Sequence, residues 1–400
     1  MKYIAKRIKI HFLLAITAMM FILSSCNKDV EQFTTPVVVT PSGLALGETI
    51  ATIPDDSLYY RFIVKSGLLT TINTKSNIFT MFVPNNAAMR QFLVAIGAPP
   101  QPQPDAVYSG FITAFVPATT AASIVSFNMI PQSITTASIP NTFPNWFYPT
   151  NLNPTSGASF NPLVRLLTFP STRNGNWINN IPLLAVNLAA ANGVIHTAAA
   201  MPAPPQKVLA QRILAPVAFG GDADMTILAA AINRADSGVA PTTSASLVWA
   251  LSNFGPNLTV FAPTNQAFKN LISFLTGGAI PPNAPDANFI AFLGSNSVST
   301  QLVKGIVVYH ILGNRAFTNN FPTTATSYPT LLNGGVPTHP GVRLTCTFTG
   351  PFVSGATVKG VGNATASNIA INPTPEPNGT SDQFFVNGVI HKIDQVLLPQ

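Results

Sequence analysis

Side chains that could do chemistry are few in this sequence, and they form no catalytic pattern. The chain of 400 residues holds 13 acidic residues and five histidines. It has neither the Gly-x-Ser-x-Gly turn of hydrolases nor the His-Glu-x-x-His pair of zinc proteases, and no two histidines stand four positions apart. Asp222 and Asp224 are not followed by the other ligands of a calcium loop. We therefore expect no enzyme, no metal and no cofactor.

The acidic residues also lack the pairing that glycoside hydrolysis needs, which is two carboxylates flanking a cleft. One apolar stretch with helical spacing follows Asp55, Asp56 and Ser57, and another follows Asp224. Because a side-chain oxygen at that position accepts hydrogen bonds from the first turn, we expect Asp55, Asp56 or Ser57 to cap one helix and Asp224 to cap the other. The first of these helices should end near Gly67.

The loop from Phe143 to Tyr148 is rich in aromatic residues. If Trp146 and Tyr148 are exposed, they could stack on the apolar face of a sugar ring while the neighbouring Asn145 binds its hydroxyls. Alternatively, Trp146 or Phe147 packs onto its own domain, which we favour because large exposed apolar patches are uncommon. Trp146 and Tyr148 remain candidate binding residues.

The first 25 residues have the composition of a secretion signal. Four basic residues before position 10 lead into a short apolar run that ends at Leu23. The run is too short for a permanent membrane span. The sequence Leu23-Ser24-Ser25-Cys26 resembles the bacterial lipobox, which implies that Cys26 is diacylated and becomes the new N-terminus. We expect a flexible tether over residues 26–45.

The residues after the cysteine indicate where the anchor lies. Asn27, in place of an aspartate, favours the outer membrane over the inner membrane. Lys28-Asp29 resembles the surface-export signal of lipoproteins of the Bacteroidetes group. We therefore expect an outer-membrane lipoprotein on the cell surface.

The net charge argues against a nucleic-acid partner. The formal charge is +7, but four of the 20 basic residues and none of the 13 acids lie in the first 25 positions. The remaining 16 basic residues, against 13 acids, give the mature chain only +3 and are scattered singly. Nucleic-acid binding needs clustered positive charge.

One cysteine remains once Cys26 carries lipid, so no intramolecular disulfide is possible. Cys346 alternates with Leu344 and Val342 in a two-residue period. This pattern places its thiol on the buried face of a strand, in the core.

An internal repeat organises the rest of the chain. Residues Phe79–Met89 recur as Leu258–Phe268, 179 positions later. Each copy reads as a buried strand ended by proline, followed by a helix that Asn85 or Thr264 caps, with Asn265 next in the second copy. The helical faces should run to Ile96 and Leu275.

A second pair of segments closes each copy. Asn192-Gly193-Val194-Ile195-His196 recurs as Asn387-Gly388-Val389-Ile390-His391. Asn-Gly between apolar runs predicts a hairpin in which both turn residues have positive φ. His391 alternates in phase with Val389 and Ile393, so we expect His196 and His391 to be buried structural histidines.

These motifs resemble the fasciclin domain. The match rests on Thr259–Phe268, on Tyr309-His310, and on Asn387–Pro399, in that order. The first copy is degenerate, with Phe127-Asn128 where the family has Tyr-His and Ala199 in place of Asp394. The resemblance implies an α+β fold, two tandem domains that each pack a wedge-shaped β-sandwich against several helices. It also implies extracellular adhesion or ligand binding without catalysis.

The domains are expected at residues 46–203 (the first domain) and 204–400 (the second domain). The boundary lies at Met201–Pro205, which reads as a semi-rigid proline-rich linker.

The family resemblance points to Tyr309 and His310 as adhesion residues. Because they end an apolar run from Leu302 to Leu312, we favour a packed position with an internal hydrogen bond for His310. Thr264, Asn265, Asn387, Gly388, His196 and His391 are taken as structural residues of the motifs.

The sequence therefore predicts a non-catalytic lipoprotein, held by Cys26, that binds an extracellular protein or polysaccharide. Two alternatives remain open. One is a carbohydrate-capture accessory of a glycan-uptake system, and the other is an envelope scaffold that faces the periplasm.

Overall fold

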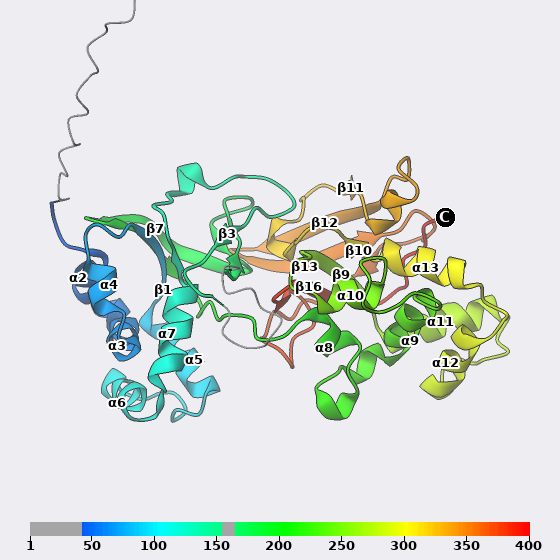
Figure 1. Cartoon of the computed structure of the whole chain (residues 1–400), viewed down its shortest axis with the longest axis horizontal. Helices are drawn as coiled ribbons and strands as arrows, with labels where there is room; N and C mark the ends of the chain where they lie inside the picture. Colours follow the sequence, from blue (N-terminus) through cyan, green and yellow to red (C-terminus); the bar gives the residue numbers. More distant parts are fainter. Residues whose placement is uncertain (1–41, 154–164) are drawn as a thin grey trace, which may run out of the picture. The chain divides into compact units, whose positions relative to one another are not determined.

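The structure, a computed structural model, describes residues 42–153 and 165–400 (Figure 1). The expected signal segment, Cys26 and all but the end of the expected tether lie outside these residues. Within the described ranges no single helix is long and apolar enough to cross a membrane. One helix pair, α6 (Asp105–Phe115) with α7 (Ala118–Phe127), has the length and composition but is bent by 111°.

The first domain begins with helices and ends with a hairpin. Its elements are α2 (Leu46–Ala51), η1 (Pro54–Asp56), α3 (Ser57–Ser66), α4 (Leu69–Asn73), β1 (Phe79–Pro84), α5 (Asn86–Ala95), α6, α7, β2 (Met129–Ile130), η2 (Thr136–Ser138), β3 (Tyr148–Pro149), β4 (Leu167–Thr168), β5 (Pro170–Ser171), β6 (Trp177–Ile178), β7 (Ile181–Ala190) and β8 (Gly193–Ala198).

The second domain repeats this order and adds strands before its final hairpin. Its elements are α8 (Leu209–Ile213), η3 (Val217–Phe219), η4 (Ala223–Met225), α9 (Thr226–Ala235), α10 (Leu247–Ser252), β9 (Leu258–Pro263), α11 (Asn265–Leu275), α12 (Asp286–Gly294), α13 (Thr300–Tyr309), β10 (Ile311–Leu312), η5 (Thr318–Asn320), β11 (Thr326–Tyr328), η6 (Leu331–Gly334), β12 (Val342–Thr349), β13 (Phe352–Lys359), β14 (Ser367–Asn368), β15 (Gln383–Phe385) and β16 (Gly388–Ile393).

The same strand pairing lies at the centre of both domains. β1 pairs in parallel with β8 and antiparallel with β2, and β9 pairs in parallel with β16 and antiparallel with β10. The sheets run β2-β1-β8-β7-β6-β5 in the first domain and β10-β9-β16-β15 in the second. The expected α+β class is confirmed.

The second domain has a complete β-sandwich. Its other sheet runs β11-β12-β13-β14 and lies over one face of β9 and β16, while helices cover the other face. Val260 packs in the helical core, and the next residue, Phe261, packs inside the sandwich with Leu344 and Val358. Because successive side chains of a strand point to opposite faces, this double covering buries every residue of β9.

The first domain has a smaller second layer in its described residues. Phe82, the counterpart of Phe261, is covered by loop residues Ile134 and Ile139 and by Tyr148 of the short β3–β4 pair. Helices α2 to α7 cover the other face, and in Figure 1 they lie along one side of β1 and β7.

Asn85 and Thr264 cap helices α5 and α11, as predicted. Asn85 Oδ1 accepts a hydrogen bond from Ala88 N at 2.9 Å, and Thr264 Oγ1 accepts one from Ala267 N at 3.2 Å. The apolar faces are shorter than predicted: Ile96 and Leu275 are 44% and 63% exposed because they lie at the ends of their helices.

The predicted capping by aspartates is only partly right: Asp56 takes the N-cap position of α3, but neither α3 nor α9 is capped by an aspartate side chain. Helix α3 does end at Gly67, which has a φ of 73°, but Asp56 makes no capping hydrogen bond with its side chain. Asp224 does not cap α9, because the N-cap position of that helix is Met225. Asp224 Oδ1 instead accepts a hydrogen bond from Asn265 N at 3.2 Å. Asn86, the first residue of α5, and Asn265, the first residue of α11, bind these helix starts instead, as described below.

The segment between the domains is packed. Pro202, Pro204 and Pro205 are buried, so the proline-rich stretch is not an exposed spacer. By their contacts, residues Ser42–Gln400 form one compact unit.

Candidate functional site

One asparagine in each repeat binds the start of an earlier helix. Asn265 Oδ1 accepts a hydrogen bond from Ile227 N at 3.1 Å, and its Nδ2 donates to Ala223 O at 3.0 Å and to Asp286 Oδ2 at 2.6 Å. Asn86 makes the same set of contacts in the first domain, with Leu58 N, Pro54 O and Asp105 Oδ2. Each asparagine therefore joins three separate segments of its domain and acts in the scaffold.

The Asn-Gly pairs also have a scaffold role, which differs from the predicted one. The hairpins are present, but neither asparagine has a positive φ. Instead, Asn387 Oδ1 accepts from Leu209 N at 2.9 Å, and Nδ2 donates to Leu251 O and Asn253 O, both at 2.8 Å. Asn192 makes the equivalent bonds to Leu46 N, Ile72 O and Asn77 O in the first domain.

The glycines that follow are required by close packing. A Cβ atom on Gly193 would lie 1.8 Å from Phe79 O, and one on Gly388 would lie 2.6 Å from Leu258 O. Any larger residue would push the central parallel strands apart.

His196 and His391 are fully buried and hydrogen-bonded. His391 Nε2 contacts Ala316 O at 2.9 Å, and its Nδ1 accepts from Asp382 N at 3.1 Å. His196 repeats this arrangement with Ile134 O and Asn187 N. Burial lowers the pKa of both imidazoles, although the Asp382 carboxylate, 3.9 Å from Nδ1, opposes the shift at His391. Because Nδ1 is an acceptor, His391 is neutral and its contact with Asp382 is not an ion pair.

Tyr309 and His310 lie inside the second domain. Tyr309 is fully buried and its hydroxyl donates to Gly341 O at 2.7 Å. His310 is 2% exposed; its Nδ1 donates to Ile306 O and its Nε2 accepts from Leu397 N, both at 2.8 Å. Burial lowers the pKa of His310 to about 4. The packed position with internal hydrogen bonds is therefore the one that the structure shows.

The aromatic loop presents two rings to solvent. Trp146 and Phe147 are 53% and 42% exposed, and their rings stack at 5.6 Å with an interplanar angle of 12°. The favoured interpretation, in which one of them packs onto its own domain, is thus wrong. Tyr148 is half-buried against the core around Phe82, and its hydroxyl lies 3.4 Å from Ser138 O.

The residues on each side of these rings are anchored. Asn145 is buried, and it exchanges hydrogen bonds with the second domain through Arg315 O and Phe317 N, both at 3.1 Å. Phe143 packs edge-on against Tyr328 with the ring centres 4.3 Å apart. We call the exposed Trp146 and Phe147 pair the aromatic platform.

In the described part of the chain, no three acidic, histidine or cysteine side chains gather into a group that could hold a metal ion. Asp222 is paired with Arg212 at 2.7 Å and with Lys392 at 2.8 Å. Asp56 is buried, and burial raises its pKa to about 7. The negative charge of the neighbouring Asp55 is the second, smaller cause of this rise. Cys346 is a core thiol as expected: it is buried inside the sandwich and its Sγ contacts Phe321 O at 3.2 Å, and this burial raises its pKa to about 12.

Sequence patterns did not indicate the contacts that join the two domains. Asn174 Nδ2 donates to Asn319 O at 3.0 Å and to Phe321 O at 2.8 Å, and Ser171 Oγ donates to Asn320 Oδ1 at 2.8 Å. Asn174 lies in a turn, Ser171 in the two-residue strand β5 and Asn320 in the three-residue helix η5. Elements this short carry no periodic pattern that could mark a buried face.

A buried arginine lies at the centre of this junction. Arg315 is 1% exposed, and its guanidinium carbon lies 4.6 Å from the ring centre of Phe169 in the first domain and 5.0 Å from that of Phe384 in the second. Its Nη2 donates to Val386 O at 3.0 Å. Burial lowers its pKa to about 9, and no carboxylate among the described residues forms an ion pair with it. The two rings therefore take the place of an acidic partner.

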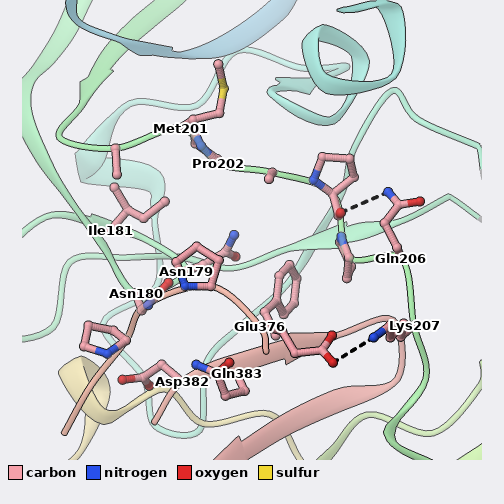
Figure 2. Close-up of a pocket in the computed structure, with 17 residues that line it drawn as sticks. Asn179, Asn180, Ile181, Met201, Pro202, Gln206, Lys207, Glu376, Asp382 and Gln383 are labelled. Carbon is pink, nitrogen blue, oxygen red and sulfur yellow. Dashed lines mark hydrogen bonds and ion pairs between the residues drawn. The ribbon is translucent and has the colours of Figure 1, made fainter. Parts of the chain in front are cut away.

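A cavity of about 450 Å³ opens beside the junction (Figure 2). It is lined by the turn at residues 179–181, the interdomain segment 200–207 and residues between 373 and 384. Figure 2 shows Lys207 and Glu376 joined by an ion pair, with Nζ 2.9 Å from Oε1.

Comparisons with known proteins agree with the repeat. The fasciclin domain model matches residues 55–200 and 233–399. No curated protein matches the chain. Among solved structures, the FAS1 domain pair of the insect cell adhesion molecule fasciclin I is similar at 13% identity, covering 85% of this chain and 95% of that one with a TM-score of 0.32. From the family match over both repeats, the chain belongs to the fasciclin family and carries two fasciclin domains in tandem.

Proposed function

We propose that this protein is a non-catalytic lipoprotein of the outer membrane and cell surface, anchored through Cys26, that mediates adhesion by binding an extracellular protein or polysaccharide. The family supports the general role, since fasciclin domains are typically involved in cell adhesion. The observation that carries the proposal is the aromatic platform. Trp146 and Phe147 stay exposed although anchored residues flank them, and large aromatic rings are frequent centres of binding surfaces.

In this proposal the buried Tyr309 and His310 support binding indirectly, by stabilising the fold of the second domain. Their side chains hold the end of α13 against residues Gly341 and Leu397, so substituting either one should lower stability and binding together. Lost adhesion with an unchanged melting temperature would instead make His310 a contact residue.

Carbohydrate capture for glycan uptake is the second candidate, favoured by the same platform because stacked rings suit the apolar face of a sugar. A glycan array separates the two. Selective glycan binding that disappears in Trp146→Ala supports capture, and binding only to cells or matrix protein supports adhesion. Phe219→Ala is the matched control, since Phe219 is 81% exposed and lies outside the platform.

The location is tested on intact cells that express the full-length chain. Protease added outside should remove the protein, whereas full protection would contradict surface adhesion and support a scaffold that faces the periplasm. Cys26→Ser should release the protein from membranes. Continued labelling of that variant with a lipid precursor would contradict lipidation at Cys26.

A further inference from the structure

The cavity beside the domain junction, which we call the junction cavity, has the form of a small-molecule site. Its volume of about 450 Å³ lies within the usual range for such sites, which are frequent at domain junctions. Figure 2 shows Met201 and Pro202 across the cavity from Asp382 and Gln383. Both domains and the segment between them are therefore needed to form its walls.

Gln383 lines this cavity and has a buried hydrogen-bond acceptor to which no described residue donates. The residue is 5% exposed, and its Nε2 donates to Thr374 O at 2.9 Å and to Ser381 O at 2.8 Å. These two bonds fix the orientation of the amide. The remaining atom, Oε1, is buried and has no hydrogen-bond partner among residues 42–153 and 165–400. A ligand hydroxyl that supplies the missing donor would remove a desolvation penalty.

Two further amides line the cavity. Asn180 is half-buried and its side chain makes no hydrogen bond with the described residues. Gln206 is exposed, and its Nε2 donates to Pro204 O at 3.1 Å. Each amide offers a donor and an acceptor, the combination that recognises hydroxyl groups.

The apolar part of the wall is rigid. Five prolines contribute to it, and a proline ring fixes its own backbone angle φ. A wall of this kind keeps its shape before a ligand arrives, so little entropy is lost on binding. The prolines are Pro202, Pro204, Pro205, Pro373 and Pro375.

The charges around the cavity disfavour an anion. Lys207 is paired with Glu376 at 2.9 Å, so its ammonium is already neutralised. Asp382 is buried, and its carboxylate accepts hydrogen bonds from Thr318 N and Oγ1. Its neighbour His391 is neutral, so no cation among the described residues balances this carboxylate.

We propose that the junction cavity binds one neutral saccharide unit. Its hydroxyls would meet the amides of Asn180, Gln206 and Gln383, and its apolar face would lie on the proline rings. This inference does not rest on the proposed adhesion function, because Trp146 and Phe147 do not line the cavity.

Saturation-transfer NMR on the full-length chain in detergent tests this proposal, with neutral mono- and disaccharides and the matching uronic acids as probes. We expect transfer to the neutral sugars and none to the uronic acids. Ala203 is exposed and lines the cavity, so Ala203→Phe should fill it and weaken binding at least tenfold. Asn180→Ala should weaken binding about fivefold, the usual contribution of one hydrogen bond.

The matched control variants change residues that do not line the cavity. Ala240→Phe and Asn296→Ala change exposed residues outside it and should leave binding unchanged. Transfer to no neutral sugar, equal transfer to uronic acids, or binding that survives Ala203→Phe would each overturn the proposal. Trp146→Ala should reduce adhesion and leave cavity binding intact, so failure of one proposal is distinguishable from failure of the other.

Discussion

The two domains share a buried polar scaffold and differ in what surrounds it. Asn86 and Asn265 occupy equivalent positions and bind equivalent groups, as do His196 and His391. The first domain has Phe127-Asn128 where the second has Tyr309-His310, yet the backbone hydrogen bond at this position is the same in both. Phe82 N donates to Asn128 O at 3.0 Å, as Phe261 N donates to His310 O at 2.9 Å.

The periphery shows where the domains diverged. In the second domain, Asp394 accepts hydrogen bonds from Ser367 Oγ and Asn368 N and so ties β14 to β16, whereas the first domain has Ala199 at that position. The loop around Phe143 in the first domain contacts Tyr328 and Phe321 of the second. The central asparagines and histidines therefore stabilise the fold shared by both domains. The outer layer of the first domain instead contacts the second domain and carries the aromatic platform.

The largest expected effect is on the shared scaffold. Asn387→Ala would leave Leu209 N, Leu251 O and Asn253 O without their partner. Because each unsatisfied buried group costs about 1–3 kcal/mol, we expect the free energy of unfolding to fall by about 4 kcal/mol. Urea unfolding followed by circular dichroism measures this loss. Asn192→Ala should give a similar value, and a difference of more than about 2 kcal/mol between them would break the equivalence of the domains.

The next effect concerns the junction. Arg315→Ala removes the guanidinium between Phe169 and Phe384 and leaves a cavity there. We expect a loss of about 3 kcal/mol, and two unfolding steps where the parent chain shows one. Differential scanning calorimetry detects this change. A single transition in both proteins would show that Arg315 does not couple the domains.

A pH effect should be specific to the first domain. The pKa of Asp56 rises to about 7 on folding, so the native state binds more protons than the unfolded state between about pH 4 and pH 7. Stability from this group is present below pH 4 and is lost as the pH rises to 7. Asp56→Asn, which stays uncharged, should therefore add about 2 kcal/mol at pH 8 and almost nothing at pH 4. Chemical unfolding at the two pH values measures the difference, and equal gains at both would contradict a raised pKa.

The smallest expected effect concerns His310 in the second domain, where stability falls as the pH falls, opposite to the trend at Asp56. The pKa of His310 falls to about 4 on folding, so protonation favours the unfolded state and stability is lost as the pH falls from about 6.5 to 4. His310→Asn places the first domain's residue there and should reduce this acid-induced loss by about 1–2 kcal/mol. The readout is the melting temperature between pH 7 and pH 4. His196 and His391 keep part of the acid sensitivity, so an unchanged pH profile in the variant would contradict the assignment to His310.

The repeat made much of the fold predictable. Strands β1 and β9, the helices that follow them and the final hairpins carry strong local patterns, because period-two burial and N-cap residues act over a few positions. The failed predictions concern long-range contacts. The positions of Asp56 and Asp224 in the chain predicted that they cap helices. The amides at those helix starts instead donate to Asn86 and Asn265, which lie 28 and 38 residues further along the chain.

The candidate sites were only partly predictable for the same reason. An aromatic cluster at Phe143–Tyr148 is evident in the sequence, but the exposure of Trp146 depends on Asn145 and Phe143 being held by the second domain. Gln383 and Asn180 carry no pattern at all, because a cavity wall assembled from three distant segments has no period along the chain.

The internal repeat and the family resemblance predicted the two-domain α+β architecture, and the alternation of apolar residues predicted the buried histidines and the core position of Cys346, because these patterns are local properties of the chain. The apolar run favoured a packed His310, but its partners Ile306 and Leu397, the exposure of Trp146 and Phe147, and the burial of Arg315 between two rings are visible only in the folded chain. Those outcomes depend on which surfaces the two domains cover on each other, and that is set by packing between residues far apart in the chain.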